Sequence, residues 1–210
     1  LPFGLTVAPL TSALAAGNRA LLKPSEFVPE TAALFAEVVP KYFSKDEVAV
    51  VTGGAEVSQQ FAQLPFDHLL FTGSTRVGAQ VMQAASKNLV PVTLELGGKS
   101  PVIVGPDANI KNAARWIAWG RFLNAGQVCV APDHVFVHES VQEEFLKALK
   151  AQITRMYGDN PVQSSSMAQM IHPQHWARVA GLIADARAKG ATILTGGQTD
   201  EATRKIAPTV

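Results

Sequence analysis

The 210-residue sequence has one cysteine, no Asn-x-Ser/Thr glycosylation signal and no block of basic residues. One cysteine cannot form an internal disulfide, which indicates a reducing compartment, and we expect the protein to be cytoplasmic. A net charge of +1 provides no positive surface to attract phosphate backbones, which argues against nucleic acid as a partner. The most apolar stretch, Leu5–Gly17, is too short and too interrupted to span a bilayer, so we expect no membrane partner either.

Clustered metal ligands and a leader peptide are also missing from the sequence. No Cys/His cluster and no His-Glu-x-x-His motif occurs, so we expect no metal site. The chain starts at Leu1 without an initiator methionine or a charged leader, and it stops at Val210 in what looks like an extended segment. We therefore expect it to be a piece of a longer protein.

The sequence is rich in apolar residues, at 47% against 17% charged, with a mean hydropathy of +0.13, which is typical of a globular protein. Its periodicity predicts helices that alternate with short apolar strands. Such alternation, with Gly/Pro turns, predicts right-handed β-α-β crossovers and a parallel sheet. The expected helices are Leu5–Ala16, Pro29–Tyr42, Ala55–Gln63, Arg76–Lys87, Ile110–Leu123, Val141–Met156 and His175–Lys189, and the expected strands are Ala20–Lys23, Val48–Thr52, His68–Thr72, Val90–Leu96, Pro101–Val104, His134–His138 and Ala191–Leu194.

The alternating pattern restarts after the Gly97-Gly98 pair, which is a plausible hinge. We therefore expect an α/β fold with a parallel-sheet, Rossmann-like unit over residues 1–98. A second α/β unit is expected over residues 99–210, and both units are expected to be truncated.

A glycine motif stands where a predicted strand turns into a helix, in the order Gly73, Ser74, Thr75, Arg76, Val77, Gly78. Backbone N–H groups at a helix N-terminus favour an anion, although a well-capped turn explains the motif equally simply. The Lys-Ser/Thr of a P-loop does not follow, which argues against a kinase or an ATPase. The Gly-x-Gly-x-x-Gly fingerprint of ordinary Rossmann dehydrogenases is absent too.

Lys23 and Glu26 follow the first predicted strand, where ligands of open parallel sheets gather. This pair can hold ribose hydroxyls by charge-assisted hydrogen bonds. A surface lysine beside a glutamate that leads into a helix remains the simpler alternative for the pair alone.

Glu95 and Cys129 are the candidates for chemistry. Glu95 ends a predicted apolar strand, and we expect partial burial to make it suitable as a general base. It can instead be a structural carboxylate for the Gly97-Gly98 turn. Cys129 follows Asn124-Ala125-Gly126-Gln127, a run that predicts a turn presenting the thiol with its own N–H free to face an oxyanion. A lone cysteine in an apolar stretch is otherwise most often a buried small hydrophobe.

Four motifs in order resemble those of the aldehyde dehydrogenase superfamily. They are Leu22-Lys23-Pro24-Ser25-Glu26, Phe71-Thr72-Gly73-Ser74-Thr75, Glu95-Leu96-Gly97-Gly98-Lys99 and Gly126-Gln127-Val128-Cys129, the last cysteine lying 34 residues after Glu95. The similarity extends through nearly the whole chain. Residues 48–57, 64–78 and 129–133 most resemble the class 3-like branch, especially bacterial coniferyl aldehyde dehydrogenases.

The resemblance implies NAD(P)-dependent oxidation of an aldehyde to a carboxylic acid. Cys129 would attack the aldehyde, and Glu95 would activate the water that hydrolyses the thioester. Lys23 and Glu26 would contact the adenosine ribose, and Gly73 to Gly78 would lie by the pyrophosphate, with Ser74 as a phosphate donor. Residues 1–98 would then belong to a NAD(P)-binding domain and residues 99–210 to a catalytic domain.

The resemblance also implies NAD rather than NADP as the preferred cofactor, because Glu26 would repel a 2′-phosphate, although this branch often accepts NADP. The full-length parent would be a homodimer or a higher homo-oligomer. The family's oxyanion asparagine would immediately precede Leu1, and its Glu-x-Phe-Gly-Pro run would follow Val210. We therefore expect the 210-residue chain alone to be inactive or nearly so. A non-catalytic dinucleotide-binding fragment is the main alternative.

Overall fold

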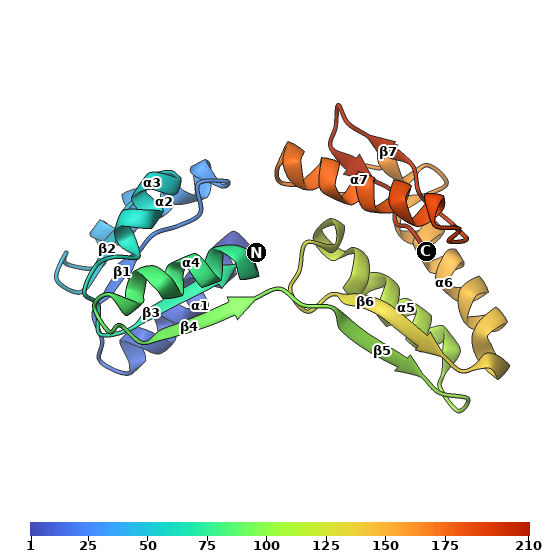
Figure 1. Cartoon of the computed structure of the whole chain (residues 1–210), viewed down its shortest axis with the longest axis horizontal. Coiled ribbons are helices and arrows are strands. Elements are labelled where there is room, and N and C mark those ends of the chain that lie inside the picture. The colour runs from blue at the N-terminus through green and yellow to red at the C-terminus, as the bar shows by residue number, and fades with distance from the viewer. The chain divides into compact units, whose positions relative to one another are not determined.

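Helices and strands alternate along most of the chain, and the longer strands, β1 to β6, form parallel pairs, as the sequence predicts. The computed structural model describes residues 1–210, which divide into two compact units, Leu1–Leu96 and Gly97–Val210 (Figure 1). The division lies next to the Gly97-Gly98 pair. No helix is long and apolar enough to cross a membrane.

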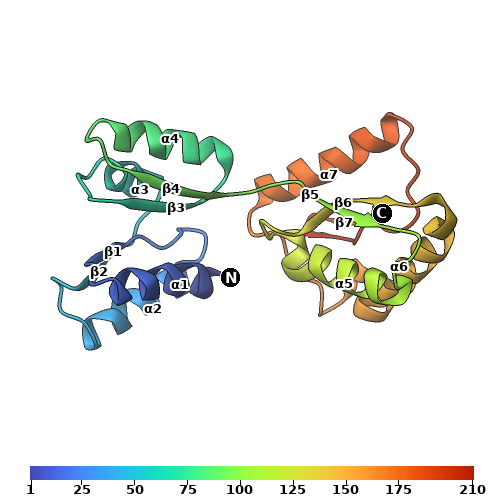
Figure 2. The same ribbon diagram turned by 90° about the horizontal axis from the view of Figure 1, so that it is seen from below.

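The first unit contains four α-helices and four strands. Its strands lie between α4 on one side and α1 and α2 on the other (Figure 2). The elements in chain order are α1 (Pro2–Ala15), β1 (Ala20–Leu22), α2 (Pro29–Val38), a 3-10 turn (Val39–Lys41), β2 (Val48–Val50), α3 (Ala55–Phe61), β3 (Leu69–Gly73), α4 (Thr75–Ser86) and β4 (Val92–Leu96).

The strands of the first unit form two parallel pairs, β1–β2 and β3–β4, and not one continuous sheet. Each pair has its own apolar cluster. Val48 of β2 packs with Phe35 and Val39, whereas Leu69 of β3 packs with Ala85 of α4. Each strand pair thus packs against its own helices.

Prolines set the ends of the first two helices. Pro2 occupies the first turn of α1, where a missing N–H costs nothing, so this helix begins before the predicted Leu5. Pro29 starts α2 in the same way. The predicted helix Pro29–Tyr42 is wrong at its end, because Pro40 has no N–H to continue the ladder and the chain tightens into the 3-10 turn.

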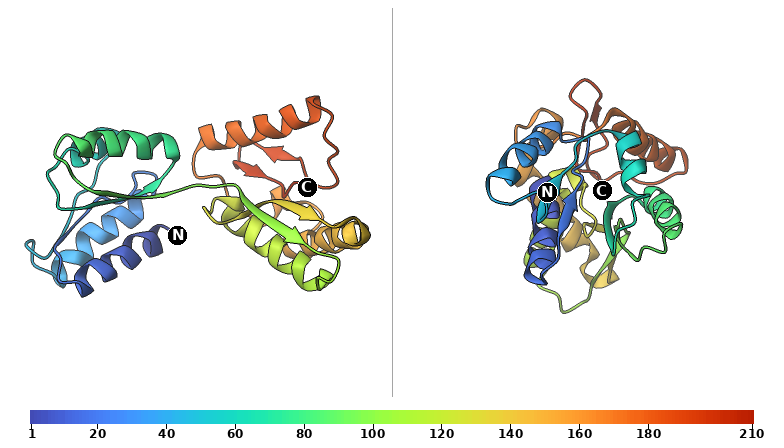
Figure 3. Two further views of the ribbon diagram at one scale, coloured as in Figure 1. Left: turned by 60° about the horizontal axis from the view of Figure 1, so that its bottom comes forward. Right: turned by 90° about the vertical axis from the view of Figure 1, so that its left-hand side faces the viewer.

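The second unit is built on the parallel pair β5–β6, with Ile103 opposite Phe136 in the register. Figure 3 shows α5 beside these strands. The elements are β5 (Ser100–Val104), α5 (Ile110–Phe122), a short turn (Leu123–Gly126), β6 (Pro132–Val137), α6 (Gln142–Tyr157), α7 (Pro173–Ala188), β7 (Thr199–Asp200) and β8 (Lys205–Ile206), with two further 3-10 turns at Glu139–Val141 and Pro161–Gln163.

The core of the second unit lies between β5–β6, α5 and α6. Asn109 begins α5 by accepting a 3.1 Å hydrogen bond from the Asn112 N–H, so the helix axis is fixed at its start. Phe145 is the largest fully buried side chain, at 1% exposed. The buried cluster comprises Val104, Ile110, Ala114, Ile117, Ala118, Phe122, Phe145, Leu149, Ile153, Tyr157 and Met167.

The predicted strand Ala191–Leu194 is wrong. This segment forms no strand: the Ala191 N–H bonds back to the Ala186 carbonyl at the end of α7, and the Leu194 N–H bonds to the Val210 carbonyl. The short antiparallel pair β7–β8 was not predicted; each of its strands has only two residues, too few for a visible alternation.

Candidate active site

The glycine motif forms the junction between β3 and α4. Ser74 is the N-cap, and its Oγ accepts a hydrogen bond from the Val77 N–H at 3.3 Å. A hydroxyl that accepts one bond still has a hydrogen to donate, so capping and phosphate binding are compatible. A Cβ on Gly78 would lie 2.8 Å from Leu96 Cδ2, so glycine lets the first turn of α4 pack closely on β4.

Lys23 and Glu26 contact each other just after β1. Lys23 Nζ lies 2.9 Å from Glu26 Oε2, and the side chains are 9% and 35% exposed. Partial burial opposes ionisation of Glu26, but a hydrogen bond from its own backbone N–H and the bond and charge of Lys23 outweigh it. The pKa of Glu26 is therefore lowered, and the carboxylate is negatively charged at neutral pH.

Glu95 lies in β4 opposite Thr72 of β3. Its side chain is exposed within the structure, so the expectation of partial burial is wrong. The reason is strand alternation: Leu96 faces α4 at Gly78, so Glu95 projects to the opposite face of the pair. On that face the carboxylate is accessible to water.

Cys129 follows the tight turn that ends α5. Asn124, Ala125 and Gly126 all have left-handed backbones, with φ of 52°, 56° and 75°. The predicted turn is therefore present, and Cys129 is exposed, unlike a buried small hydrophobe. Gly98 lies beside this loop, since a Cβ on it would be 3.9 Å from the Cys129 carbonyl oxygen.

The N–H group of Cys129 and the thiol have no hydrogen-bond partner in the structure. A free N–H next to an exposed thiol is an arrangement that can receive an oxyanion. This site belongs to the second unit, whereas Glu95, Lys23, Glu26 and the glycine motif belong to the first.

The sequence interpretation missed the side chains that hold the Cys129 turn. Gln127 was noted only as part of the turn, yet its amide bonds to residues 169 and 171. Arg121 bonds to Asp133 at 3.2 Å and lies under Gly126. The only local signal was a polar amide between Gly126 and apolar Val128, and such an amide needs partners when it is partly buried.

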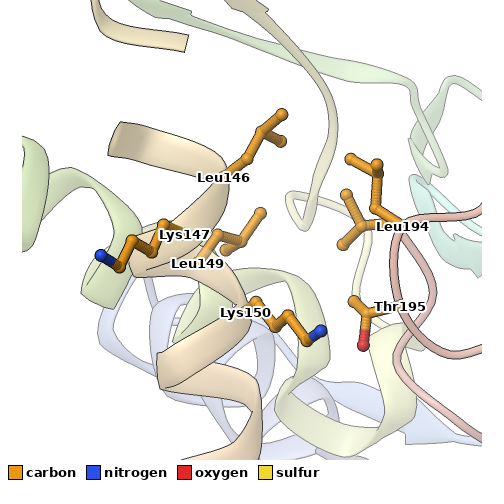
Figure 4. A pocket seen from close by; sticks show the side chains of 7 residues that line it. Leu146, Lys147, Leu149, Lys150, Leu194 and Thr195 are labelled. Carbon is orange, nitrogen blue, oxygen red and sulfur yellow. The ribbon is translucent and has the colours of Figure 1, made fainter. Parts of the chain in front are cut away.

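One hollow of the second unit lies away from these residues. It has a volume of about 330 Å³ and lies between α6 and the C-terminal segment, lined mainly by apolar atoms (Figure 4). Its lining residues are Leu146, Lys147, Leu149, Lys150, Leu194, Thr195 and Val210, none of which is a candidate for the chemistry.

Comparison with known proteins identifies the family. The family model "Aldehyde dehydrogenase family" matches residues 1–210. The chain is 44% identical to aldehyde dehydrogenase family 3 member A2 of Rattus norvegicus, covering 100% of this chain and 42% of the relative. It is 48% identical to the probable coniferyl aldehyde dehydrogenase of Caulobacter vibrioides, again over 100% of this chain but 44% of the relative.

The fold agrees with the solved structure of an aldehyde dehydrogenase. The Mycobacterium tuberculosis aldehyde dehydrogenase complexed with NAD+ superposes with a TM-score of 0.87 at 32% identity, covering 99% of this chain and 44% of that one. The chain thus spans less than half the length of the proteins it matches. On these matches, the chain belongs to the aldehyde dehydrogenase family, in its class 3-like branch.

Proposed function

We propose that the protein containing this chain oxidises aldehydes to carboxylic acids with NAD, using Cys129 as nucleophile and Glu95 as general base. The observation that carries the proposal is the exposed Cys129, with an unbonded N–H, on a left-handed turn of a chain that matches the family over its whole length. The first unit would bind the dinucleotide, and the second would carry the nucleophile.

The chemistry of Cys129 follows from its position. The thiolate attacks the aldehyde carbon, forming a C–S bond, and the carbonyl oxygen becomes an oxyanion that the Cys129 N–H can receive. Loss of hydride from that carbon leaves a thioester. Glu95 takes a proton from water, the resulting hydroxide attacks the thioester, the C–S bond breaks, and the acid leaves.

The residues of the first unit fit a dinucleotide. NAD, when bound, supplies the hydride acceptor. The first turn of α4 offers N–H groups and the Ser74 hydroxyl to a phosphate, and the lowered pKa of Glu26 keeps a negative carboxylate for a ribose hydroxyl. The related M. tuberculosis enzyme is complexed with NAD+, which supports this assignment.

An aromatic aldehyde such as coniferaldehyde is the proposed substrate. Its support is the 48% identity with the probable coniferyl aldehyde dehydrogenase of C. vibrioides. Turnover of a panel of aromatic and aliphatic aldehydes by the whole protein tests this choice. A clear preference for long aliphatic aldehydes would exclude it while leaving the reaction type intact.

Glu95→Gln in the whole protein is expected to lower steady-state aldehyde oxidation about a hundredfold, because water loses its base and the thioester persists. Stopped-flow measurement should still show one rapid burst of NADH per site, and mass spectrometry should detect the acyl group on Cys129. Glu56→Gln, a change to an exposed glutamate of α3 in the same unit, is the matched control and should turn over normally. A normal steady-state rate in Glu95→Gln would remove Glu95 from the mechanism.

Glu26→Gln is expected to raise the ratio of kcat/KM with NADP to that with NAD by about tenfold, which corresponds to about 1.4 kcal/mol. The change removes the charge that would repel a 2′-phosphate and leaves Lys23, its ion-pair partner, available to attract one. The control is Glu30→Gln on the exposed first turn of α2. A wild-type protein that clearly prefers NADP would refute the assigned role of Glu26.

A further inference from the structure

The backbone before Cys129 is unusual because three consecutive residues are left-handed. Asn124 has φ 52° and ψ 37°, Ala125 has φ 56° and ψ 30°, and Gly126 has φ 75°. This region is strained for residues other than glycine, and for alanine more than for asparagine, so surrounding contacts are needed to hold Ala125 there. The position of the Cys129 thiol therefore depends on the contacts that stabilise this turn.

The Gln127 side chain provides three hydrogen bonds at this point. Its Nε2 donates to the Asn124 carbonyl at 2.9 Å and to the Gln169 carbonyl at 3.1 Å. Its Oε1 accepts from the Ile171 N–H at 2.9 Å. Two carbonyls on one side and an N–H on the other determine which end of the amide is oxygen, so no other side chain of this length satisfies all three groups.

The segment that receives Gln127 is itself fixed. Met167 and Met170 are buried at 4% and 6% exposed. The Met170 N–H donates to the Arg204 carbonyl at 2.9 Å, and Arg204 Nη2 donates to Gln169 Oε1 at 3.1 Å. Gln127 therefore connects the turn to a part of the second unit that is anchored by both burial and hydrogen bonds.

A second contact supports the turn from the α5 side. Arg121 Nη1 lies 3.2 Å from Asp133 Oδ1, and Lys99 Nζ lies 3.0 Å from the other oxygen of that carboxylate. A Cβ on Gly126 would be 2.7 Å from Arg121 Nη2, so the guanidinium fills the space under the turn. Arg121 blocks movement toward α5, but its side chain makes no hydrogen bond to residues 124–127. The directional hold comes from Gln127.

We infer that Gln127 is a positioning residue for the proposed nucleophile: it ties the left-handed turn to residues 169–171 and so sets the direction of the Cys129 thiol and N–H. This inference rests on the proposed function of Cys129. A misplacement of about 1 Å at a reacting group can cost a hundredfold in rate, so loss of these bonds should appear in the chemical step.

The test compares Gln127→Met, which keeps the length but removes all three hydrogen bonds, with Gln142→Met at the exposed start of α6. In the whole protein, active-site titration with an aldehyde and NAD gives the burst amplitude, and stopped flow gives the burst rate. We expect Gln127→Met to lower the burst rate about tenfold to a hundredfold at unchanged amplitude, with the KM for NAD within about twofold. Gln142→Met should match the wild type.

Hydrogen–deuterium exchange provides a readout that does not depend on activity. In Gln127→Met, peptides covering residues 124–129 and Ile171 should exchange faster, while those covering α6 should not change. A reduced burst amplitude at an unchanged rate would mean that Gln127 only supports folding, and it would overturn the inference. Unchanged exchange together with an unchanged burst rate would overturn it as well. A wild-type protein that oxidises no aldehyde would instead refute the proposed function.

Discussion

Cys129→Ala in the whole protein is expected to reduce aldehyde-dependent NAD reduction by at least about ten-thousandfold. Loss of an enzyme's covalent nucleophile removes the whole acyl-enzyme route, and no other thiol exists in these 210 residues to replace it. The side chain is exposed, so the substitution should change the free energy of unfolding by no more than about 0.5 kcal/mol. Initial rates of NADH formation measure the loss, and thermal unfolding verifies that the fold is intact.

Ser165→Ala is the matched control for this substitution, because it also removes one heavy atom from an exposed side chain that makes no side-chain hydrogen bond. It should retain wild-type activity. NAD binding by Cys129→Ala should persist, since the proposed cofactor residues lie in the other unit. A Cys129→Ala protein that still oxidises aldehydes would identify the chain as a dinucleotide-binding module whose nucleophile lies elsewhere.

Phe145→Ala is expected to lower the free energy of unfolding of the second unit by about 3–5 kcal/mol. Phe145 is 1% exposed and belongs to the cluster formed by α5, α6 and β5, so its removal leaves a cavity that these packed elements cannot close. All three tryptophans, Trp116, Trp119 and Trp176, lie in the second unit, so their fluorescence during urea unfolding reports this unit alone.

Phe136→Ala provides the comparison for that measurement. Phe136 has the same side chain in the same unit but is 61% exposed on the outer face of β6, so its loss should cost less than about 1 kcal/mol. Equal destabilisation by the two substitutions would contradict the placement of the core between β5–β6, α5 and α6.

The helices and longer strands could be predicted from the sequence because their signals are local. Apolar periodicity indicates α4, α5 and α6, and a side-chain cap begins both α4 and α5. Two other elements could not be predicted. The segment 191–194 is apolar like a strand, but its ends bond to Ala186 and Val210 and not to a partner strand. The β7–β8 pair is too short to have a pattern.

The site shows the same division between local and distant causes. A turn before Cys129 follows from Asn124-Ala125-Gly126. The hydrogen bonds that fix the turn could not be predicted from the local sequence, because Gln127 bonds to residues more than 40 positions away. The exposure of Glu95 depends on which face of β3–β4 the helix α4 covers, which strand alternation alone does not specify.

The single exposed thiol of Cys129 also makes a ready reporter position. In the 210-residue chain, a maleimide dye attaches to one defined atom without any engineered cysteine. With every tryptophan in the same unit, energy transfer to such a dye measures distances inside the second unit only. A dye there would therefore register movement of the Gln127-held turn separately from events in the unit that carries Lys23 and Glu26.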